Sequence, residues 1–321
     1  MRNCSFRFFG LMVLLATSLL LTSPVLGKKT KQKRSAAKKM RPFHWVNKVP
    51  QKFQKINGLK HETYYSKVNK VKVGYFVLLP PGYHKKKNQQ KRYPVVYDLH
   101  GGRPGSEIKD LPLVPKIQKA MQSGQVPPMI YVFNNGGEVS HYDFPEKKSW
   151  GETTFIKELI PHIDNMYRTI PQREGRGLEG FSQGGRATGR LMFKYPELFI
   201  SAAPMGGGHQ REKKIAETKG YENKNLYFSK WKTNTYDTAR RYAKRKTKPS
   251  LNILIVVGDK DGNYQANLDW MKHLDSLNIR YSKIILKGVR HNGHLVYDRT
   301  GINIMRFHAK NFGLLKKTYP K

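Results

Sequence analysis

Short apolar runs alternate with amphipathic segments along most of the chain, and this pattern predicts its elements. Apolar runs that end near glycine, proline, asparagine or aspartate are typical of buried β-strands. Segments with apolar residues three and four positions apart are typical of helices packed on one face. The predicted strands are residues 71–79, 93–99, 129–133, 177–181, 200–205, 251–257 and 281–286, and the predicted helices are 113–122, 156–166, 186–195, 265–277 and 302–312.

The order of these elements predicts an α/β fold. Strands that alternate with helices, and that are apolar on both faces, indicate a mainly parallel central sheet with helices on both faces. Ligands bind such sheets at the carboxyl ends of the strands. Each polar motif described below directly follows a predicted strand, so we expect these motifs to meet at one edge of the sheet.

The amino-terminal segment differs from the rest of the chain. Residues 1–27 combine a basic start, an apolar run from Phe8 to Leu21 and small residues at the end, as a secretory signal peptide does. Residues 28–47 are rich in lysine and arginine, and we expect a disordered basic arm. The remaining residues, 48–321, suit one catalytic domain. The predicted location is therefore secreted or periplasmic, with a membrane anchor as the alternative for the apolar run.

The charge and the cysteine content limit the partners and the kinds of chemistry that we expect for this protein. The formal net charge is +38, from 60 Lys+Arg against 22 Asp+Glu, which attracts polyanions. For an exported protein, we expect an anionic polymer or a cell-envelope surface as partner, and no specific nucleic acid; a merely solvated basic surface is the alternative. Cys4 is the only cysteine and lies in the predicted signal peptide. This excludes disulfides and a cysteine nucleophile from the predicted mature chain.

A candidate nucleophile follows the predicted strand 177–181. Residues 180–184 read Gly-Phe-Ser-Gln-Gly and match the pattern G-x-S-x-G. In this pattern the serine occupies a sharp turn between strand and helix, and the flanking glycines allow the two elements to approach closely. The hydroxyl then stands clear of the sheet at the positive end of a helix. We interpret Ser182 as the nucleophile; a plain glycine-rich turn is the alternative.

A serine nucleophile needs a base that takes its proton and a carboxylate that orients the base. In this type of fold the order along the chain is serine, then acid, then histidine. The sequence favours His291, which follows the predicted strand 281–286, and leaves His294 as its rival. For the acid it favours Asp261, in the loop after strand 251–257, and leaves Asp259 as the alternative.

The same loop lacks the glycine and glutamate spacing of a calcium-binding loop, so no metal site is predicted there. Acyl transfer also needs backbone N–H donors for the developing oxyanion. Gln183 follows the nucleophile, and His100-Gly101-Gly102 follows the predicted strand 93–99. We therefore predict an oxyanion hole formed by the backbone N–H groups of Gln183 and Gly102.

Five stretches of the sequence together resemble the putative esterase family, which includes feruloyl esterases and S-formylglutathione hydrolase. They are residues 79–83 (LPPGY), 93–102 (YPVVYDLHGG), 158–163 (ELIPHI), 180–185 (GFSQGG) and 258–261 (GDKD). The resemblance extends over about residues 48–312. It implies an α/β-hydrolase fold, ester substrates, no cofactor, and a triad at Ser182, Asp261 and His291. Where the family often has Gly-x-Gly-His before the base, this chain has Gly288-Val289-Arg290-His291, which places a cation beside the base.

The sequence thus predicts a secreted serine hydrolase that cleaves carboxylic esters through an acyl-enzyme. Residues 206–250 form a candidate cap insertion. Its aromatic residues either pack in a small subcore, which is the interpretation we prefer, or stack on sugar or phenolic rings of a carbohydrate-linked ester such as an esterified polysaccharide. Two alternatives remain open at this point. One is a noncatalytic polyanion-binding protein on a hydrolase scaffold, and the other is an acyltransferase.

Overall fold

The computed structural model describes residues 42–145, 148–209, 221–223, 226–227 and 234–315. The predicted signal peptide, most of the predicted arm and part of the candidate cap insertion lie outside these residues. None of the helices in the described part of the chain has both the length and the apolar character needed to cross a membrane.

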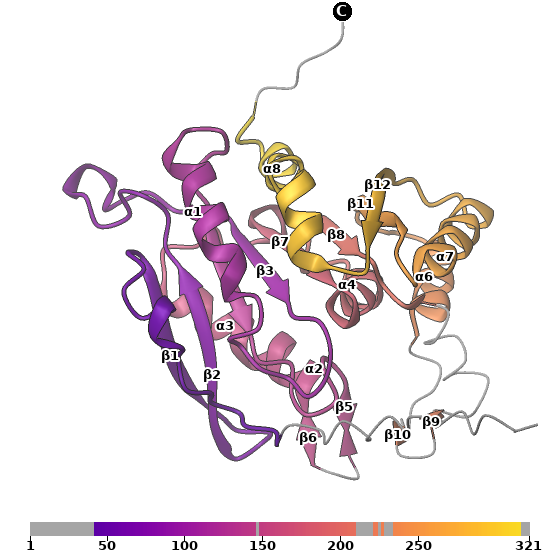
Figure 1. Cartoon of the computed structure of the whole chain (residues 1–321), viewed down its shortest axis with the longest axis horizontal. Coiled ribbons are helices and arrows are strands. Elements are labelled where there is room, and N and C mark those ends of the chain that lie inside the picture. Colours follow the sequence, from indigo (N-terminus) through magenta and orange to yellow (C-terminus); the bar gives the residue numbers. More distant parts are fainter. Residues whose placement is uncertain (1–41, 146–147, 210–220, 224–225, 228–233, 316–321) are drawn as a thin grey trace, which may run out of the picture. The chain divides into compact units, whose positions relative to one another are not determined.

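An eight-stranded sheet forms the centre of the described residues (Figure 1). The first strand pairs antiparallel with the second, and the second pairs antiparallel with the next strand in the sheet. All the following pairs are parallel. This confirms the predicted mainly parallel sheet. In spatial order the strands are β1 (Leu59–Ser66), β2 (Val71–Leu78), β4 (Ile130–Asn134), β3 (Val95–Leu99), β7 (Arg176–Phe181), β8 (Ser201–Met205), β11 (Asn252–Lys260) and β12 (Ser282–Arg290).

Helices cover both faces of this sheet, as predicted (Figure 1). One face packs against α1 (Val114–Gln122) and α8 (Gly293–Asn311). The opposite face packs against α3 (Ile160–Met166), α4 (Gln183–Lys194), α6 (Thr235–Ala243) and α7 (Tyr264–Ser276). The shorter elements are η1 (Gln51–Phe53), η2 (Lys86–Asn88), η3 (Leu111–Leu113), β5 (Asp143–Phe144), β6 (Ser149–Trp150), α2 (Gly151–Thr153), η5 (Thr154–Leu159), η6 (Arg173–Gly175), β9 (Tyr221–Asn223) and β10 (Leu226–Tyr227).

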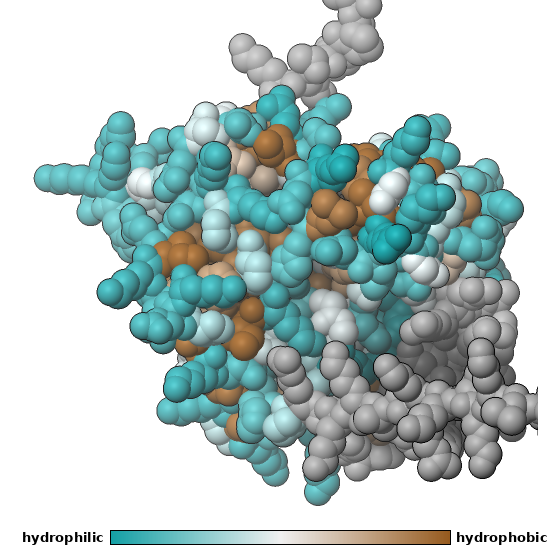
Figure 2. All heavy atoms as spheres, in the orientation of Figure 1, coloured by the Kyte–Doolittle hydropathy of each residue, from teal (hydrophilic) through white to brown (hydrophobic). Residues whose placement is uncertain are grey.

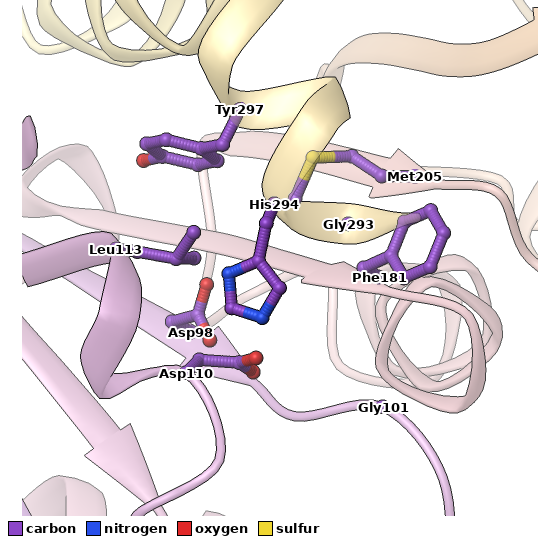
Figure 3. Close-up of a pocket in the computed structure, with 9 residues that line it drawn as sticks. All are labelled: Asp98, Gly101, Asp110, Leu113, Phe181, Met205, Gly293, His294 and Tyr297. Carbon is purple, nitrogen blue, oxygen red and sulfur yellow. The ribbon is translucent and has the colours of Figure 1, made fainter. Parts of the chain in front are cut away.

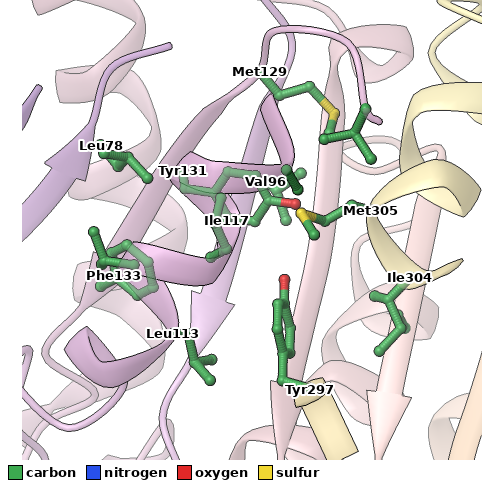
Figure 4. Packing of buried hydrophobic residues seen from close by; sticks show 14 of the residues in the cluster. Leu78, Val96, Leu113, Ile117, Met129, Tyr131, Phe133, Tyr297, Ile304 and Met305 are labelled. Carbon is green, nitrogen blue, oxygen red and sulfur yellow. The ribbon is translucent and has the colours of Figure 1, made fainter. Parts of the chain in front are cut away.

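The central strands are apolar because helices cover both faces of the sheet. Successive side chains of a strand point to opposite faces of the sheet. On β3, Val96 packs in the cluster with α1 and α8 (Figure 4), whereas Val95 and Tyr97 pack in the cluster on the other face. All three side chains are fully buried. A strand covered on both faces therefore reads as a continuous apolar run.

Several elements differ from the sequence-based predictions, among them the helix α6, which was not predicted. Strand β1 was not predicted, because it lies at the sheet edge and most of its residues are polar and at least partly exposed. Helix α8 begins at Gly293, well before the predicted start at residue 302. The first part of the predicted helix 156–166 belongs to the π-helix η5, which ends at Leu159, shortly before Pro161. The proline ring conflicts with the carbonyl four residues earlier, at Lys157, and the wider π turn contains that residue.

The last residues of the predicted arm contact the sheet. The backbone carbonyl of Trp45 accepts a hydrogen bond from the backbone N–H of Gly74 at 2.8 Å. The backbone N–H of Asn47 donates to Oε1 of Glu107 at 2.7 Å. Residues 42–47 thus pack with the domain, and the folded part of the chain starts before residue 48.

The surface drawn in Figure 2 is mostly hydrophilic, with small scattered hydrophobic spots. Within the candidate cap insertion, the described segment α6 contributes to the core instead of to this surface. Its Tyr236 is 6% exposed and packs in the same cluster as Trp270 of α7. The aromatic residues Tyr221, Tyr227, Phe228 and Trp231 of the insertion lie outside the residues whose side chains are described.

Candidate active site

Ser182 occupies a strained turn between β7 and α4. Its backbone has φ 59° and ψ −110°, a conformation that residues other than glycine rarely adopt. The turn is held because the Ser182 N–H donates to the carbonyl of Met205 at 2.9 Å and its own carbonyl accepts from the Arg186 N–H. Strained backbone of this kind persists where the surrounding structure fixes it, and it clusters at functional sites.

Glycines allow α4 to lie close against the sheet beside this turn. A Cβ atom at Gly184 would lie 1.6 Å from the carbonyl oxygen of Leu99, and one at Gly180 would lie 2.5 Å from the same oxygen. No side chain fits at such distances without movement of the backbone. The two glycines of the G-x-S-x-G pattern are therefore required by the contact between β3, β7 and α4.

Three predicted site residues meet at the carboxyl ends of the strands. Ser182 Oγ lies 2.8 Å from His291 Nε2, and Nδ1 of the same ring lies 2.8 Å from both carboxylate oxygens of Asp261. The Asp261 side chain is fully buried and also accepts a hydrogen bond from the Asn263 N–H at 2.7 Å. In this arrangement the serine hydroxyl donates to Nε2 and the Nδ1–H group donates to the carboxylate.

The rival residues take other positions. Asp259 Oδ1 accepts a hydrogen bond from the backbone N–H of Gly288 at 2.7 Å, at the irregular end of the pairing between β11 and β12. His294, in the first turn of α8, lines a cavity with Asp98 and Asp110 instead of contacting Asp261 (Figure 3). Of the two candidate pairs, the structure thus brings His291 and Asp261 to the hydroxyl of Ser182.

The loop after β3 carries Gly102, the predicted oxyanion-hole donor. Gly102 has a φ of 65°, and its carbonyl accepts a hydrogen bond from Ser140 Oγ. Lys109 Nζ donates to the carbonyl of Gly101 at 3.0 Å, which fastens the loop from its other side. Gln183, the second predicted donor, is the first residue of α4, where backbone N–H groups lack partners within the helix.

A buried pair of histidines also fixes this loop, a role that was not predicted from the sequence. Nε2 of His100 accepts hydrogen bonds from the N–H groups of Gly136 (3.0 Å) and Ser106 (3.3 Å). Nε2 of His141 lies 2.9 Å from the His100 carbonyl. Burial lowers the pKa of His100 well below its ordinary value and that of His141 to about 3, so both rings are neutral. The His-Gly-Gly motif was the only sequence signal of this arrangement.

Two guanidinium groups flank the Gln183 side chain, next to the serine. Nη2 of Arg186 donates to Gln183 Oε1 at 2.6 Å, and Nη2 of Arg103 donates to the same oxygen at 3.5 Å. Ser182, Gln183 and Arg186 line a small cavity of about 30 Å³ with residues 208 and 263. The surroundings of the serine are therefore positively charged.

A second cavity of about 110 Å³ lies between the loop after β3 and the start of α8 (Figure 3). Asp98, Asp110, His294 and Tyr297 are its titratable lining residues. Burial, reinforced by the neighbouring carboxyl groups of Asp110 and Glu179, raises the pKa of Asp98 well above its ordinary value of 3.8. Burial likewise raises the pKa of Asp110. Among the described residues, no group of three or more histidine, cysteine or acidic side chains is arranged to hold a metal ion.

The raised pKa of Asp98 makes stability depend on pH. A group whose folded-state pKa is raised stabilises the fold below its unfolded-state pKa and loses that contribution as the pH rises through the folded-state value. We therefore expect Asp98→Asn, which mimics the neutral carboxyl group, to unfold at a higher temperature than wild type at pH 8 and at about the same temperature at pH 4. Thermal unfolding followed by circular dichroism measures this. An Asn variant that is less stable than wild type at pH 8 would contradict the assignment.

Comparison with known proteins places the chain in a family. The family model described as Putative esterase matches residues 66–302. An esterase of Mycobacterium tuberculosis (strain H37Rv) is 31% identical over 139 residues, which are 42% of this chain and 29% of that protein. The endo-1,4-beta-xylanase/feruloyl esterase of Xylanibacter ruminicola is 31% identical over 155 residues, which are 44% of this chain and 20% of that protein. The chain thus spans less than a third of the length of these curated relatives.

Solved structures agree on the fold. A ferulic acid esterase superposes with a TM-score of 0.65 at 20% identity, covering 79% of this chain and 98% of its own. This similarity confirms the predicted α/β-hydrolase fold. Since the family model spans most of the chain, the chain belongs to the Putative esterase family.

Proposed function

We propose that this chain is a serine hydrolase that cleaves carboxylic esters, with Ser182 as nucleophile, His291 as base and Asp261 as the residue that orients the base. The observation that carries the proposal is the unbroken series of contacts from Asp261 through His291 to Ser182, each at 2.8 Å. Membership of the Putative esterase family supports the same reaction.

In the proposed reaction, His291 Nε2 takes the proton of Ser182 as Oγ attacks the ester carbonyl. The tetrahedral intermediate collapses to an acyl-enzyme, and the alcohol leaves with the proton from the imidazolium. Water then attacks the acyl-enzyme by the same route and releases the acid. The buried carboxylate of Asp261 holds the ring in the tautomer with Nδ1–H and stabilises the imidazolium that forms.

The developing oxyanion needs fixed donors, and we propose the N–H groups of Gly102 and Gln183. Gln183 lies at the amino terminus of α4, where the helix dipole favours negative charge. The contacts of Lys109, Ser140 and His100 hold the loop of Gly102 in place before the substrate binds. Such preorganised donors contribute about 3 kcal/mol each to transition-state stabilisation.

We further propose that the enzyme is exported and acts on an ester linked to carbohydrate. The signal-like segment 1–27 supports export. The relative from Xylanibacter ruminicola, whose name combines a xylanase with a feruloyl esterase, supports a polysaccharide-linked ester.

A burst experiment with 4-nitrophenyl acetate tests the proposed function. An acyl-enzyme that forms faster than it breaks down releases about one equivalent of nitrophenol per enzyme before the steady state. The absence of both burst and turnover, for this ester and for feruloylated xylan fragments, would contradict ester hydrolysis. Added sugar acceptors distinguish hydrolysis from acyl transfer, because transfer gives an acylated sugar in place of free acid.

Asp261→Asn should lower kcat about 10⁴-fold, because the neutral amide favours the wrong tautomer of His291 and cannot stabilise the imidazolium. Asp259→Asn is the matched control in the same loop, and we expect its kcat to stay within about threefold of wild type, since Asp259 contacts a backbone N–H of β12. Steady-state kinetics with a fluorogenic ester measure both variants. Equal losses in the two variants would argue against Asp261 as the orienting residue.

A further inference from the structure

Three cations are direct neighbours in the chain of residues of the candidate active site. Lys260 directly precedes Asp261, and Arg290 directly precedes His291. The two cations are paired in the parallel register of β11 and β12, and both side chains are exposed. Arg103 follows Gly102 and donates to the side chain of Gln183. We call Arg103, Lys260 and Arg290 the cationic rim.

No acidic side chain neutralises the part of this rim next to the base. Within the described part of the chain, Lys260 and Arg290 form no side-chain hydrogen bond or ion pair. The acidic residues closest to them in sequence have other hydrogen-bond partners. Asp259 accepts a hydrogen bond from the Gly288 N–H, and Asp261 accepts one from His291. Lys287, also exposed, adds a further positive charge on β12.

The cationic rim is electrostatically unfavourable, and a neutral substrate would not offset this effect. Like charges beside an active site repel one another and disfavour the imidazolium that His291 forms during the reaction. Negative groups on the substrate would offset this repulsion, and they would be drawn to the site by long-range attraction. Charges act over about 8 Å at physiological salt, so the anionic groups must lie close to the scissile ester.

We propose that the preferred substrate is an acidic ester, with carboxylate or sulfate groups near the scissile bond that the cationic rim binds. This inference rests on the proposed function and assigns it a substrate class. The anionic partner expected from the net charge of +38 is then the substrate, which binds at the catalytic centre.

Two matched pairs of small esters test the proposal on the acyl and alcohol sides. The first pair is 4-methylumbelliferyl pentanoate and the mono-4-methylumbelliferyl ester of glutaric acid. The second is 4-nitrophenyl acetate and 3-carboxy-4-nitrophenyl acetate. We expect the acidic member of at least one pair to have about tenfold higher kcat/KM at low salt, and the preference to disappear in 0.5 M NaCl because exposed charges are then screened. Acetylated polygalacturonate compared with acetylated xylan extends the same test to polymers.

Charge-reversal variants identify where the preference arises. Lys260→Glu/Arg290→Glu should lower the acidic-to-neutral ratio of kcat/KM about tenfold. Lys60→Glu/Lys72→Glu changes the net charge equally on exposed positions of β1 and β2, at the opposite edge of the sheet, and should leave the ratio unchanged. Thermal unfolding of both double variants controls for folding.

The outcomes separate this inference from the proposed function. Turnover of acidic and neutral esters at equal rates overturns the acidic substrate, and a preference that survives high salt overturns the role of the cationic rim. Either result leaves ester hydrolysis intact. An equal fall of the ratio in both double variants overturns the role of the rim. If wild type hydrolyses none of the esters, ester hydrolysis itself fails.

Discussion

Replacing Ser182 by alanine is expected to lower kcat for ester hydrolysis by about 10⁶-fold. Without the hydroxyl there is no acyl-enzyme, and only the oxyanion donors and substrate binding continue to assist the attack of water. Alanine fits the turn sterically, because Cβ is already present at this position. The fold should therefore be retained, and a fluorogenic ester assay on purified protein measures the loss.

Ser276→Ala provides the control for this substitution. Ser276 is the last residue of α7, is exposed, and donates a hydrogen bond to the His273 carbonyl. Its kcat should match wild type. Residual activity of Ser182→Ala above about 1% of wild type, in protein free of contaminating esterase, would rule out Ser182 as the nucleophile.

Replacing His291 by alanine should cost about as much as the loss of the nucleophile, again near 10⁶-fold in kcat, because the two residues act as a unit. His294→Ala is the matched control three residues further on. His294 lies over Asp98 and Asp110, so we expect its loss to affect the stability around α8 and to leave kcat within about tenfold of wild type (Figure 3). Kinetics and thermal unfolding of both variants separate the two roles.

A comparison of His291→Ala with His294→Ala also tests whether His291 is the base. If His291→Ala retained most of the activity while His294→Ala lost it, the contacts at 2.8 Å between His291, Ser182 and Asp261 would not be those of the reacting enzyme. The proposed base would then have to be abandoned.

The central strands could be predicted from the sequence because burial on both faces leaves a continuous apolar signal. Strand β1 gives no such signal, since Tyr64 and Ser66 are its only buried residues and the rest of the strand is at least partly exposed at the sheet edge. The start of α8 was missed for a different reason. Its first turn carries His294 and follows the N-cap Asn292, so polar residues that belong to the site obscure the helical spacing.

The candidate site was predictable in outline because its residues follow strands that end at the same edge. Sequence alone left His291 against His294 and Asp261 against Asp259 open, since both members of each pair emerge from the same loop. The decision comes from packing: β12 continues to Arg290, with an irregular register beside Lys260, and so delivers His291 to the carboxylate of Asp261. No local pattern encodes that register shift.

The loop of Gly102 is held by contacts between segments that are distant in the sequence. His100 and His141 are 41 residues apart and meet only in the folded chain. The same holds for Asp98 and Glu179, which lie opposite each other on β3 and β7. A lone histidine or aspartate in a sequence gives no sign of such a partner, so these contacts require the structure.

The most direct measurement is the site of covalent labelling by a fluorophosphonate. The reagent phosphonylates a serine only where a base removes its proton, as His291 is proposed to do for Ser182. Mass spectrometry of the digested protein should find one adduct, on the peptide that contains Ser182, and none in His291→Ala under the same conditions. An adduct on another residue, or no adduct on active wild-type enzyme, would contradict Ser182 as the nucleophile.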